Sequence, residues 1–480
     1  MYPEAFPASK QYQPLNESIV DQIRQAVGED ALISDPERMQ PFGQDASELS
    51  AAPELVVEVT EAAQIQALLR LANQHHFPVT PRGLGTGLAG GAVPVYGGVV
   101  LSLARMNRIL KVDERNFLAL VEPGVITLDL QRAALEKGLF YPPDPASLDT
   151  CSIGGNAATN AGGPSCVKYG STRDYVLGLE AVLPNGALIR AGVLTRKGVV
   201  GYDLAHLLVG SEGTLAVITK LFLKLIPRPP AVTTLVAMFV DLVAAMRAVR
   251  AILLGGHVPC ALEFLDCHCL RLVGDLLPFA GAREAGAFLL LEVDGAADVI
   301  QRQVEAVGAI CLENEAVEVL LAPDAEKRAR MWQVRKQVSL RIEEQAVIYI
   351  PEDVVLPLAL IADFVDKLAD LEQRYQMTIY AFGHAGDGNI HLNIVSTNLE
   401  DRQRVEEGIE EILGLVLRMG GTISGEHGIG IAKKRFLPLE LSEESIQLQR
   451  AIKRVFDPNY ILNPGKVFHS LEGMDRCCPV

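Results

Sequence analysis

The sequence predicts an α+β protein with two main parts, a glycine-rich N-terminal half and a C-terminal half with a ferredoxin-like antiparallel sheet and added helices. Three observations predict this class. Strand and helix patterns alternate along the 480 residues, glycine clusters mark the first half, and strand–helix–strand repeats follow a proline-rich boundary near residue 229. A chain of this length is expected to form two or three domains.

In the first half, the hydrophobic periodicity predicts an amphipathic helix, a β-α-β unit and a hairpin. Helices are expected over 17–27 and from about Glu61 to His75, with Thr60 as the N-cap of the second helix. Asn185-Gly186 between two apolar stretches is a strong hairpin signal. Strands are expected at Leu55–Val59, Pro78–Pro81, Gly98–Leu103, Phe117–Glu122, Leu179–Leu183, Ala187–Ala191 and Thr214–Leu225.

In the second half, two strand–helix–strand repeats suit a ferredoxin-like sheet with helices on one face. Pro227, Pro229 and Pro230 mark the boundary that precedes them. Strands are expected at Thr233–Phe239, Ala261–Leu265, 287–293, 316–321, 377–383 and 390–396, and helices at 241–254, 296–309, 324–343, 356–375, 401–419 and 443–456. The predicted divisions are an N-terminal helical segment (1–50), a first domain (51–228), a second domain (229–456) and a C-terminal segment (457–480).

Composition excludes several classes of partner. Lys and Arg total 43 against 59 Asp and Glu, and a net charge of −16 argues against nucleic acid as the main partner and gives no support for polybasic attachment to lipid. No apolar run is long enough to span a membrane, and the N-terminal residues lack the pattern of a secretory signal, so a cytoplasmic location is expected. The eight cysteines lack iron–sulfur and zinc-site spacing, and Cys267-His268-Cys269 is expected on a strand, Leu262–Leu270.

Two glycine-rich segments predict a site for a long, phosphate-containing cofactor. Segment 81–91 reads Pro-Arg-Gly-Leu-Gly-Thr-Gly-Leu-Ala-Gly-Gly, and backbone so rich in glycine can approach a diphosphate closely. Gly85, Gly87 and Gly90 satisfy G-x-G-x-x-G, but the glycines and proline that follow oppose the helix that a Rossmann site requires. A second glycine-rich cluster lies at 151–163. Two separated clusters favour a site for a long dinucleotide lying across a domain over the phosphate site of an NAD-dependent Rossmann dehydrogenase.

A His-rich pair of motifs in the second half predicts a metal site. Gly386 and Gly388 disfavour a helix between His384 and His391, so a strand–turn–strand is expected to aim both rings at one point. With Glu426, these are the usual ligands of a divalent transition metal with open positions, and the adjacent His427 is the candidate base. Zinc, manganese and iron all suit this set. A metallohydrolase built on the same residues is the alternative from a different class.

Together these residues resemble the vanillyl-alcohol-oxidase/p-cresol-methylhydroxylase (PCMH) superfamily, and in particular its branch of FAD-linked D-2-hydroxyacid dehydrogenases. The similarity runs from about residue 40 to Phe468. The motifs that carry it are PRGxGTGxxGG, PDP, CSIGGNxxxNAGG, GSEGT, HAGDGNxH, GEHGIG and NPGK. The resemblance implies a two-part PCMH-type FAD-binding domain, a cap domain with the substrate site, and a final segment that returns to the flavin.

The resemblance also implies a set of FAD contacts, position by position. Thr86 stands where relatives that attach FAD covalently often carry histidine, which implies a non-covalent flavin. The diphosphate would be held by Arg82, Gly83, Leu84, Gly85, Thr86, Gly87 and Gly90; the adenosine and isoalloxazine approaches would be lined by Pro143, Asp144, Ser147, Ser152, Ile153, Gly154, Gly155, Asn156, Thr159 and Gly162; the ribityl–adenine side would be lined by Glu212, Gly213 and Ile218; and Asn463 would lie near the ring.

In the cap, His384, His391 and Glu426 match the family's metal ligands, and His427 matches its proposed base. Arg335 matches an arginine that binds the substrate carboxylate, and Ser339 lies one turn further along the same helix. The substrate contacts implied are Arg335, Ser339, His384, His391 and His427.

The resemblance implies FAD-dependent, metal-assisted oxidation of a small D-2-hydroxy acid, D-lactate or glycolate, to the 2-oxo acid. The alternative within the branch is a D-2-hydroxyglutarate dehydrogenase, but those enzymes carry a lysine near residues 349–352, where this chain has Ile350-Pro351. Electrons would pass to a non-NAD acceptor: quinone through an iron–sulfur subunit, an electron-transfer flavoprotein or a cytochrome. A homodimer or hetero-complex is expected, and peripheral association with the inner face of the membrane is compatible with the sequence.

Overall fold

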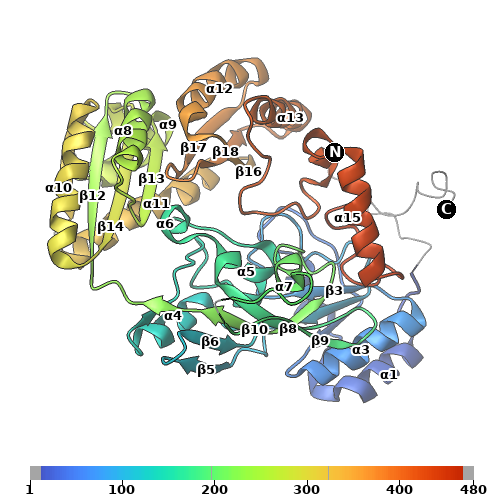
Figure 1. Ribbon diagram of the computed structural model, residues 1–480. Helices are drawn as coiled ribbons and strands as arrows, with labels where there is room; N and C mark the ends of the chain where they lie inside the picture. The colour runs from blue at the N-terminus through green and yellow to red at the C-terminus, as the bar shows by residue number, and fades with distance from the viewer. Residues whose placement is uncertain (1–11, 196, 280, 323, 469–480) are drawn as a thin grey trace. The chain divides into compact units, whose positions relative to one another are not determined.

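The computed structural model describes residues 12–195, 197–279, 281–322 and 324–468 (Figure 1). The chain separates into two compact units. The cap unit comprises Gly162–Gly170 and Pro229–Gly425, and the glycine-loop unit comprises Tyr2–Ala161, Ser171–Arg228 and Glu426–Val480, as far as these are described. The predicted divisions at residues 50, 228 and 456 stay predictions.

The glycine-loop unit contains two main sheets. In the four-stranded sheet, β1-β2-β4-β3, the last three strands are parallel, as the β-α-β pattern predicts, and the five-stranded sheet β5-β6-β10-β8-β9 is antiparallel. The strands are β1 Leu32–Ile33, β2 Leu55–Glu58, β3 Val79–Arg82, β4 Val99–Ser102, β5 Ile109–Asp113, β6 Leu118–Val121, β7 Leu139–Phe140, β8 Val176–Val182, β9 Leu188–Gly192, β10 Val217–Lys224 and β11 Ile226–Pro227.

Helices α1 and α3 bury their apolar faces against the four-stranded sheet, in a core that includes Ile23, Leu68 and Val99. The predicted N-cap of α3 was one residue early: Glu61, not Thr60, caps the helix in a capping box with Gln64. The helices of this unit are α1 Glu17–Val27, α2 Pro36–Met39, α3 Ala62–His75, α4 Thr127–Leu135, α5 Ile153–Thr159, α7 Leu204–Leu208, α14 Leu437–Glu440 and α15 Glu443–Phe456.

The cap unit is built on a seven-stranded antiparallel sheet in the order β15-β12-β14-β13-β17-β18-β16. Its strands are β12 Ala231–Phe239, β13 Ala261–Asp266, β14 Ala287–Gly295, β15 Ala316–Ala322, β16 Ile348–Val355, β17 Thr378–His384 and β18 Asn389–Ser396. Its helices are α6 Cys166–Tyr169, α8 Leu242–Leu254, α9 Cys267–Val273, α10 Ala297–Glu313, α11 Ala325–Glu343, α12 Ile361–Tyr375 and α13 Arg402–Arg418.

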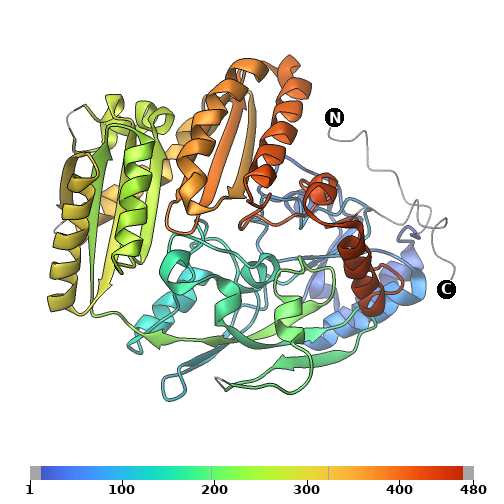
Figure 2. The same cartoon turned by 45° about the horizontal axis from the view of Figure 1, so that its top comes forward.

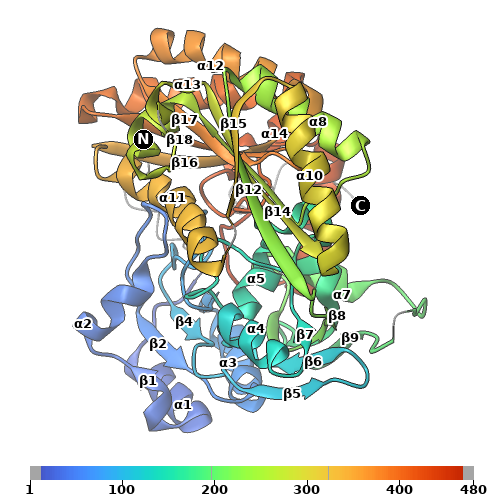
Figure 3. The ribbon, with the colours of Figure 1, turned by 90° about the vertical axis from the view of Figure 1, so that its left-hand side faces the viewer.

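Helices cover both faces of this sheet, whereas the sequence pattern suggested one. Helix α10 contacts one face through Gly308, which faces Leu235, while Val334 and Val338 of α11 pack on the other face with Val236. Figure 3 shows α10 and α11 on opposite sides of β12 and β14, and Figure 2 shows α12 and α13 beside the neighbouring strands. The reason is that strands such as β13 are buried along their whole length, so both faces need apolar cover.

Two further expectations for the cap were wrong. The predicted strand Leu262–Leu270 ends at Asp266, whose carboxylate accepts the Cys269 N–H at 2.8 Å and starts α9. The Cys267-His268-Cys269 run is therefore helical. Strand β16 was not foreseen, and the helix expected over 356–375 begins only at Ile361.

Among the described residues, no helix is long and apolar enough to cross a membrane.

Candidate functional site

The β17–β18 hairpin places His384 and His391 on one face of the cap sheet. His391 pairs with Phe382 and His384 with Asn389, so alternation of side chains directs both imidazoles to the same side. The turn depends on Gly388, which has φ +89°, and where an added Cβ would lie 2.2 Å from the carbonyl oxygen of Leu356. The strand–turn–strand expected from the glycines is confirmed.

The two imidazoles converge through their Nε2 atoms, which lie 3.4 Å apart. One ligand atom from each of His384, His391 and Glu426 lies within 4.8 Å of the others. Two neutral imidazole nitrogens and a carboxylate are the donor set of a divalent transition metal with open positions. These residues therefore fit a metal ion.

A carboxylate that sequence reasoning missed supports this group. Glu263 on β13 is 1% exposed, pairs in register with His384, and accepts a hydrogen bond from His384 Nδ1. Its other oxygen accepts from Arg335 Nε at 2.8 Å. Burial alone raises the pKa of Glu263, but the positive charges and hydrogen bonds of His384 and Arg335 outweigh burial and lower it to about 2. The carboxylate is thus held ionised between a predicted metal ligand and the predicted substrate arginine.

Arg335 projects from α11 toward the same face. Its guanidinium carbon lies 4.5 Å from the centre of the Phe382 ring, and that ring lies 5.5 Å from the ring of His391. Arg335 is therefore fixed by a carboxylate on one side and an aromatic face on the other.

The segment that leads to Glu426 is anchored on β16. Asp353, fully buried, accepts the Gly425 N–H at 2.6 Å and the Ser424 hydroxyl at 3.3 Å. At Gly425 an added Cβ would lie 2.5 Å from Asn389 Nδ2, so only glycine fits without displacing that side chain. This anchoring sets where Glu426 emerges, and His427 follows directly.

A polar group lies further along the same face. Ser339 of α11 and Asn393 of β18 adjoin the hydroxyl of Tyr349, and burial raises the pKa of Tyr349 to about 12. Asn393 Nδ2 is buried and has no hydrogen-bond partner among the described residues. A buried donor without a partner is costly, which makes it a candidate for contact with a bound molecule. Its position two residues after His391 was the available signal.

In the glycine-loop unit, the two glycine-rich segments meet. An added Cβ on Gly83 would lie 2.5 Å from Ser152 Oγ, whereas one on Gly87 would meet nothing within 4 Å. The first segment forms no helix after Gly90, as expected, but the second forms α5, capped by Ser152 Oγ on the Gly155 N–H at 3.2 Å. Glycine leaves the first loop's backbone open to a ligand.

Three further segments join these loops through Glu212 and Asn463. The Glu212 carboxylate accepts N–H bonds from Ile429 at 2.9 Å and Gly430 at 2.7 Å, and burial raises its pKa. Asn463 Nδ2 donates to the carbonyl oxygens of Gly91 at 3.0 Å and Glu212 at 2.8 Å. Asn463 Oδ1 is buried with no partner among the described residues, and could accept a hydrogen bond from a ligand N–H or O–H.

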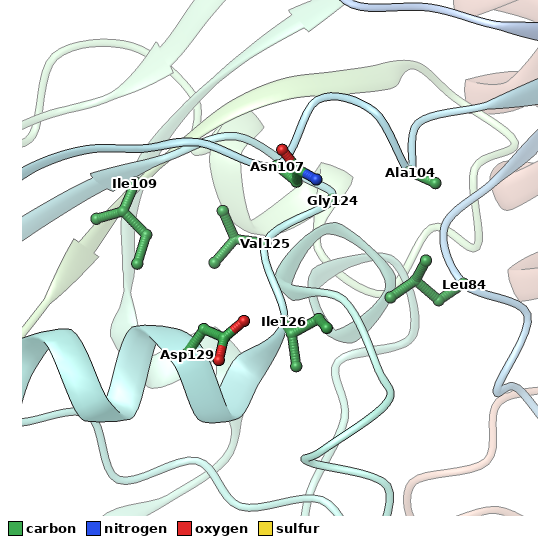
Figure 4. Close-up of a pocket in the computed structure, with 8 residues that line it drawn as sticks. All are labelled: Leu84, Ala104, Asn107, Ile109, Gly124, Val125, Ile126 and Asp129. Atoms are coloured by element: carbon green, nitrogen blue, oxygen red, sulfur yellow. The ribbon is translucent and has the colours of Figure 1, made fainter.

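A cavity of about 370 Å³ adjoins the first glycine loop (Figure 4). It is lined by Leu84, Ala104, Asn107, Ile109, Gly124, Val125, Ile126 and Asp129. Sequence reasoning assigned only Leu84 to the site; the Pro-Gly turn before α4 was the available signal for the rest. An apolar cavity beside open glycine backbone, with the orphaned Asn463 oxygen in the same unit, fits part of a dinucleotide such as FAD.

Some predicted cofactor contacts are engaged elsewhere. Arg82 donates to the carbonyl oxygens of Gln44 and Pro41, and Asn156 Nδ2 donates to Thr127 Oγ1 at 2.7 Å. The other predicted contacts also lie in the glycine-loop unit, except Gly162, which belongs to the cap unit. They are Gly85, Thr86 and Gly90 in the first loop; Pro143, Asp144 and Ser147 between β7 and α5; Ile153, Gly154 and Thr159 on α5; Gly213 after Glu212; and Ile218 on β10.

The glycine loops and the polar face of the cap define a flavin-dependent oxidoreductase. Residues 53–192 match the FAD binding domain family, and residues 228–467 match the C-terminal domain of FAD linked oxidases. The chain belongs to the FAD-linked oxidases, and within them it is an FAD-linked 2-hydroxyacid dehydrogenase by its similarity to the relatives that follow.

It is 41% identical to the glycolate oxidase subunit GlcD of Bacillus subtilis, over 89% of this chain and 92% of the relative. It is 37% identical to a D-lactate dehydrogenase of Anaerostipes hadrus, over 96% and 99% of the two chains. In fold it is similar to p-cresol methylhydroxylase (TM-score 0.77, 18% identity, 95% and 97% coverage), which confirms the predicted fold class.

Proposed function

We propose that this enzyme oxidises a small D-2-hydroxy acid, D-lactate or glycolate, to the 2-oxo acid. The observation that carries the proposal is the grouping of His384, His391 and Glu426, with His384 linked to Arg335 through Glu263. A carboxylate-binding arginine beside a set of metal ligands suits a substrate with adjacent hydroxyl and carboxylate groups.

The residues of β16 indicate the size of the substrate. This strand reads Ile-Tyr-Ile-Pro-Glu-Asp-Val-Val and carries no basic residue to bind a second carboxylate. The runner-up, a D-2-hydroxyglutarate dehydrogenase, is suggested by a 31% identical relative from rice with the name of a probable mitochondrial enzyme of that activity. The absence of a cation on β16 favours the smaller monocarboxylic acids.

The roles of the side chains follow from their surroundings. Arg335, whose Nε is already bound to Glu263, would present its two terminal nitrogens to the substrate carboxylate and fix its orientation. Asn393 and Ser339 would contact the rest of the substrate. His427 would take the hydroxyl proton as the general base, a role for which imidazole is suited at neutral pH.

Two bound groups complete the chemistry. Bound FAD, held by the glycine-loop unit, supplies the two-electron acceptor that side chains lack. A zinc, manganese or iron ion held by His384, His391 and Glu426 would supply a Lewis acid for the substrate oxygens.

Electron transfer beyond the flavin is part of the proposal. Two relatives are named as subunits of glycolate oxidase, which supports a hetero-complex for this chain. Since its cysteines lack iron–sulfur spacing, an iron–sulfur partner or an electron-transfer flavoprotein is the proposed acceptor. The expected cytoplasmic location, with peripheral membrane association, stays a prediction, and so does the homodimer alternative.

Anaerobic flavin reduction with a panel of D- and L-2-hydroxy acids tests the proposal. D-lactate or glycolate should bleach the flavin fastest, and L-lactate at least ~100-fold more slowly, because Arg335 fixes the face presented. Faster reduction by D-2-hydroxyglutarate would support the runner-up. Elemental analysis should find roughly one metal ion per chain, lost in His384→Ala together with turnover. Full activity in a metal-free preparation would contradict the metal assignment.

A further inference from the structure

Glu263 is a buried acid with both oxygens occupied by functional side chains. It lies on β13 at 1% exposure, bound to His384 Nδ1 through Oε1 and to Arg335 Nε through Oε2. These residues come from β17 and α11, 121 and 72 positions further along the chain. A single carboxylate thus joins two elements that carry different parts of the proposed site.

The contact with Glu263 determines which tautomer His384 adopts. An ionised carboxylate only accepts hydrogen bonds, so Nδ1 of His384 carries a proton, and in the neutral ring that a metal requires Nε2 presents a lone pair. That lone pair faces His391 Nε2 at 3.4 Å. A carboxylate behind a histidine fixes the ring orientation and raises the basicity of the ligating nitrogen.

The contact with Arg335 has a parallel effect. The bond from Nε to Glu263 and the stacking of the guanidinium on Phe382 leave the outer edge, with its two terminal nitrogens, as the part that can bind a carboxylate. Phe382 in turn contacts His391, so Glu263, Arg335, Phe382, His391 and His384 form a closed ring of contacts. A shift of any member disturbs the others.

We propose that Glu263 is a positioning residue that orients the metal ligand His384 and the substrate-binding Arg335 at the same time. This inference rests on the proposed function and extends it: the Glu263 carboxylate couples metal binding to the binding of the substrate carboxylate. Glu263 touches neither substrate nor metal, and it acts through its two partners.

The decisive variant is Glu263→Gln, which has the same shape. Its amide offers one acceptor oxygen and one NH2 donor, so when Arg335 Nε binds the oxygen, His384 Nδ1 faces a donor. His384 can then bond only as the tautomer whose Nε2 carries the proton, which opposes metal binding at Nε2. Glu263→Asp, which keeps the charge on a shorter side chain, is the second variant. The matched control is Glu292→Gln: Glu292 lies on the neighbouring strand and also holds α11, accepting from Trp332 Nε1 at 2.8 Å and Thr234 Oγ1 at 2.6 Å.

Two quantities are measured on the FAD-loaded protein: Zn²⁺ affinity by competition with a chelator, and the apparent Kd of D-lactate in anaerobic flavin reduction. Glu263→Gln should weaken Zn²⁺ binding ~10–100-fold and raise the apparent Kd of D-lactate at least ~10-fold. In Glu263→Asp both quantities should lie between those of Glu263→Gln and the wild type, and in Glu292→Gln both should stay within about twofold of the wild-type values. If Glu263→Gln does not fold, Glu263→Asp tests the proposal instead, because it should also show weaker Zn²⁺ binding and a higher apparent Kd of D-lactate.

The outcomes separate this inference from the proposed function. If the wild type binds no Zn²⁺, the proposed metal site itself is wrong. If the wild type binds Zn²⁺ and Glu263→Gln binds it equally well, the role of Glu263 is overturned while the metal site stands. If Glu263→Gln changes the Zn²⁺ affinity but not the apparent Kd of D-lactate, Glu263 does not position Arg335 and the proposal is contradicted. If Glu292→Gln changes both quantities as much as Glu263→Gln does, the effect of Glu263 is only general support of α11.

Discussion

Replacement of Arg335 gives the sharpest test of how this enzyme binds its substrate. The side chain is 15% exposed, its Nε is bound to Glu263, and its guanidinium lies over Phe382. The substrate carboxylate would therefore meet only the two terminal nitrogens. Arg335→Met removes both bonds, and Arg335→Lys supplies one ammonium in place of the fork.

The magnitude follows from the number of bonds lost. Each hydrogen bond between charged groups is worth about 1.5–3 kcal/mol, and about 1.4 kcal/mol is tenfold in affinity. Loss of both bonds in Arg335→Met should therefore reduce the efficiency of flavin reduction by ~10²–10⁴-fold. Arg335→Lys should lose ~10–100-fold, because a lysine cannot bind Glu263 and the substrate with the same geometry.

Stopped-flow flavin reduction at increasing D-lactate separates the two effects. The apparent Kd should rise in both variants, and the limiting rate should fall further in Arg335→Met, since orientation is lost along with affinity. Arg330→Met, an exposed arginine on the same helix, is the matched control and should behave like the wild type. An apparent Kd for Arg335→Met within about twofold of the wild type would refute the reasoning.

Three further predictions concern the metal, the flavin and the pH dependence of stability. Gly388→Ala should lose the metal while retaining FAD, because its Cβ would lie 2.2 Å from the Leu356 carbonyl oxygen and the φ of +89° disfavours alanine; elemental analysis with flavin absorbance checks this, and full metal content would contradict it. Gly87→Ala should raise the Kd of FAD at least ~10-fold while leaving the melting temperature of the apoprotein unchanged, since the protein itself leaves that space open; unchanged FAD affinity would remove Gly87 from the site. Burial lowers the pKa of Lys466 from 10.5 to about 7, so as pH falls from 10.5 to about 7 the unfolded chain takes up a proton that the buried amine resists, and the folded state loses stability. Lys466→Met should therefore raise the melting temperature of the apoprotein more at pH 7 than at pH 10. An equal gain at both pH values would contradict this.

The sequence predicted those parts of the site that are local in the chain. The His384–His391 hairpin could be foreseen because Gly386 and Gly388 disfavour a helix between the two histidines, and strand alternation then fixes the direction of both rings. The first glycine loop could be recognised for a similar reason: the residues that follow Gly90 oppose a helix, and the structure has none there.

The parts that were missed depend on long-range pairing or on capping. Glu263 lies 121 residues before His384, and only the register of β13 with β17 brings them together. An acid between apolar residues of a buried strand was a usable signal, because a buried carboxylate requires a partner. The Cys267–Cys269 run was assigned to a strand because the capping role of Asp266 was overlooked.

Substrate size can be tested at Pro351, the position on β16 that pairs with Asn393. Alternation along the strand places Pro351 on the same face as Tyr349 and Asp353, beside the proposed substrate contacts, while Ile350 points to the opposite face. β16 is the last strand of the sheet, where proline is tolerated because its missing N–H is not needed for pairing. A lysine at this position should therefore fit the backbone and add a cation to this face.

Pro351→Lys should raise kcat/KM for D-2-hydroxyglutarate relative to D-lactate by at least ~10-fold, since one hydrogen bond between charged groups contributes about 1.5–3 kcal/mol. Pro351→Met, of similar length but without charge, controls for loss of the ring and should leave the ratio near the wild-type value. The measurement is steady-state turnover of the two acids with an artificial electron acceptor. If both variants shift the ratio equally, the distal end of the substrate does not lie against this part of β16, and the monocarboxylic preference must arise from another wall of the site.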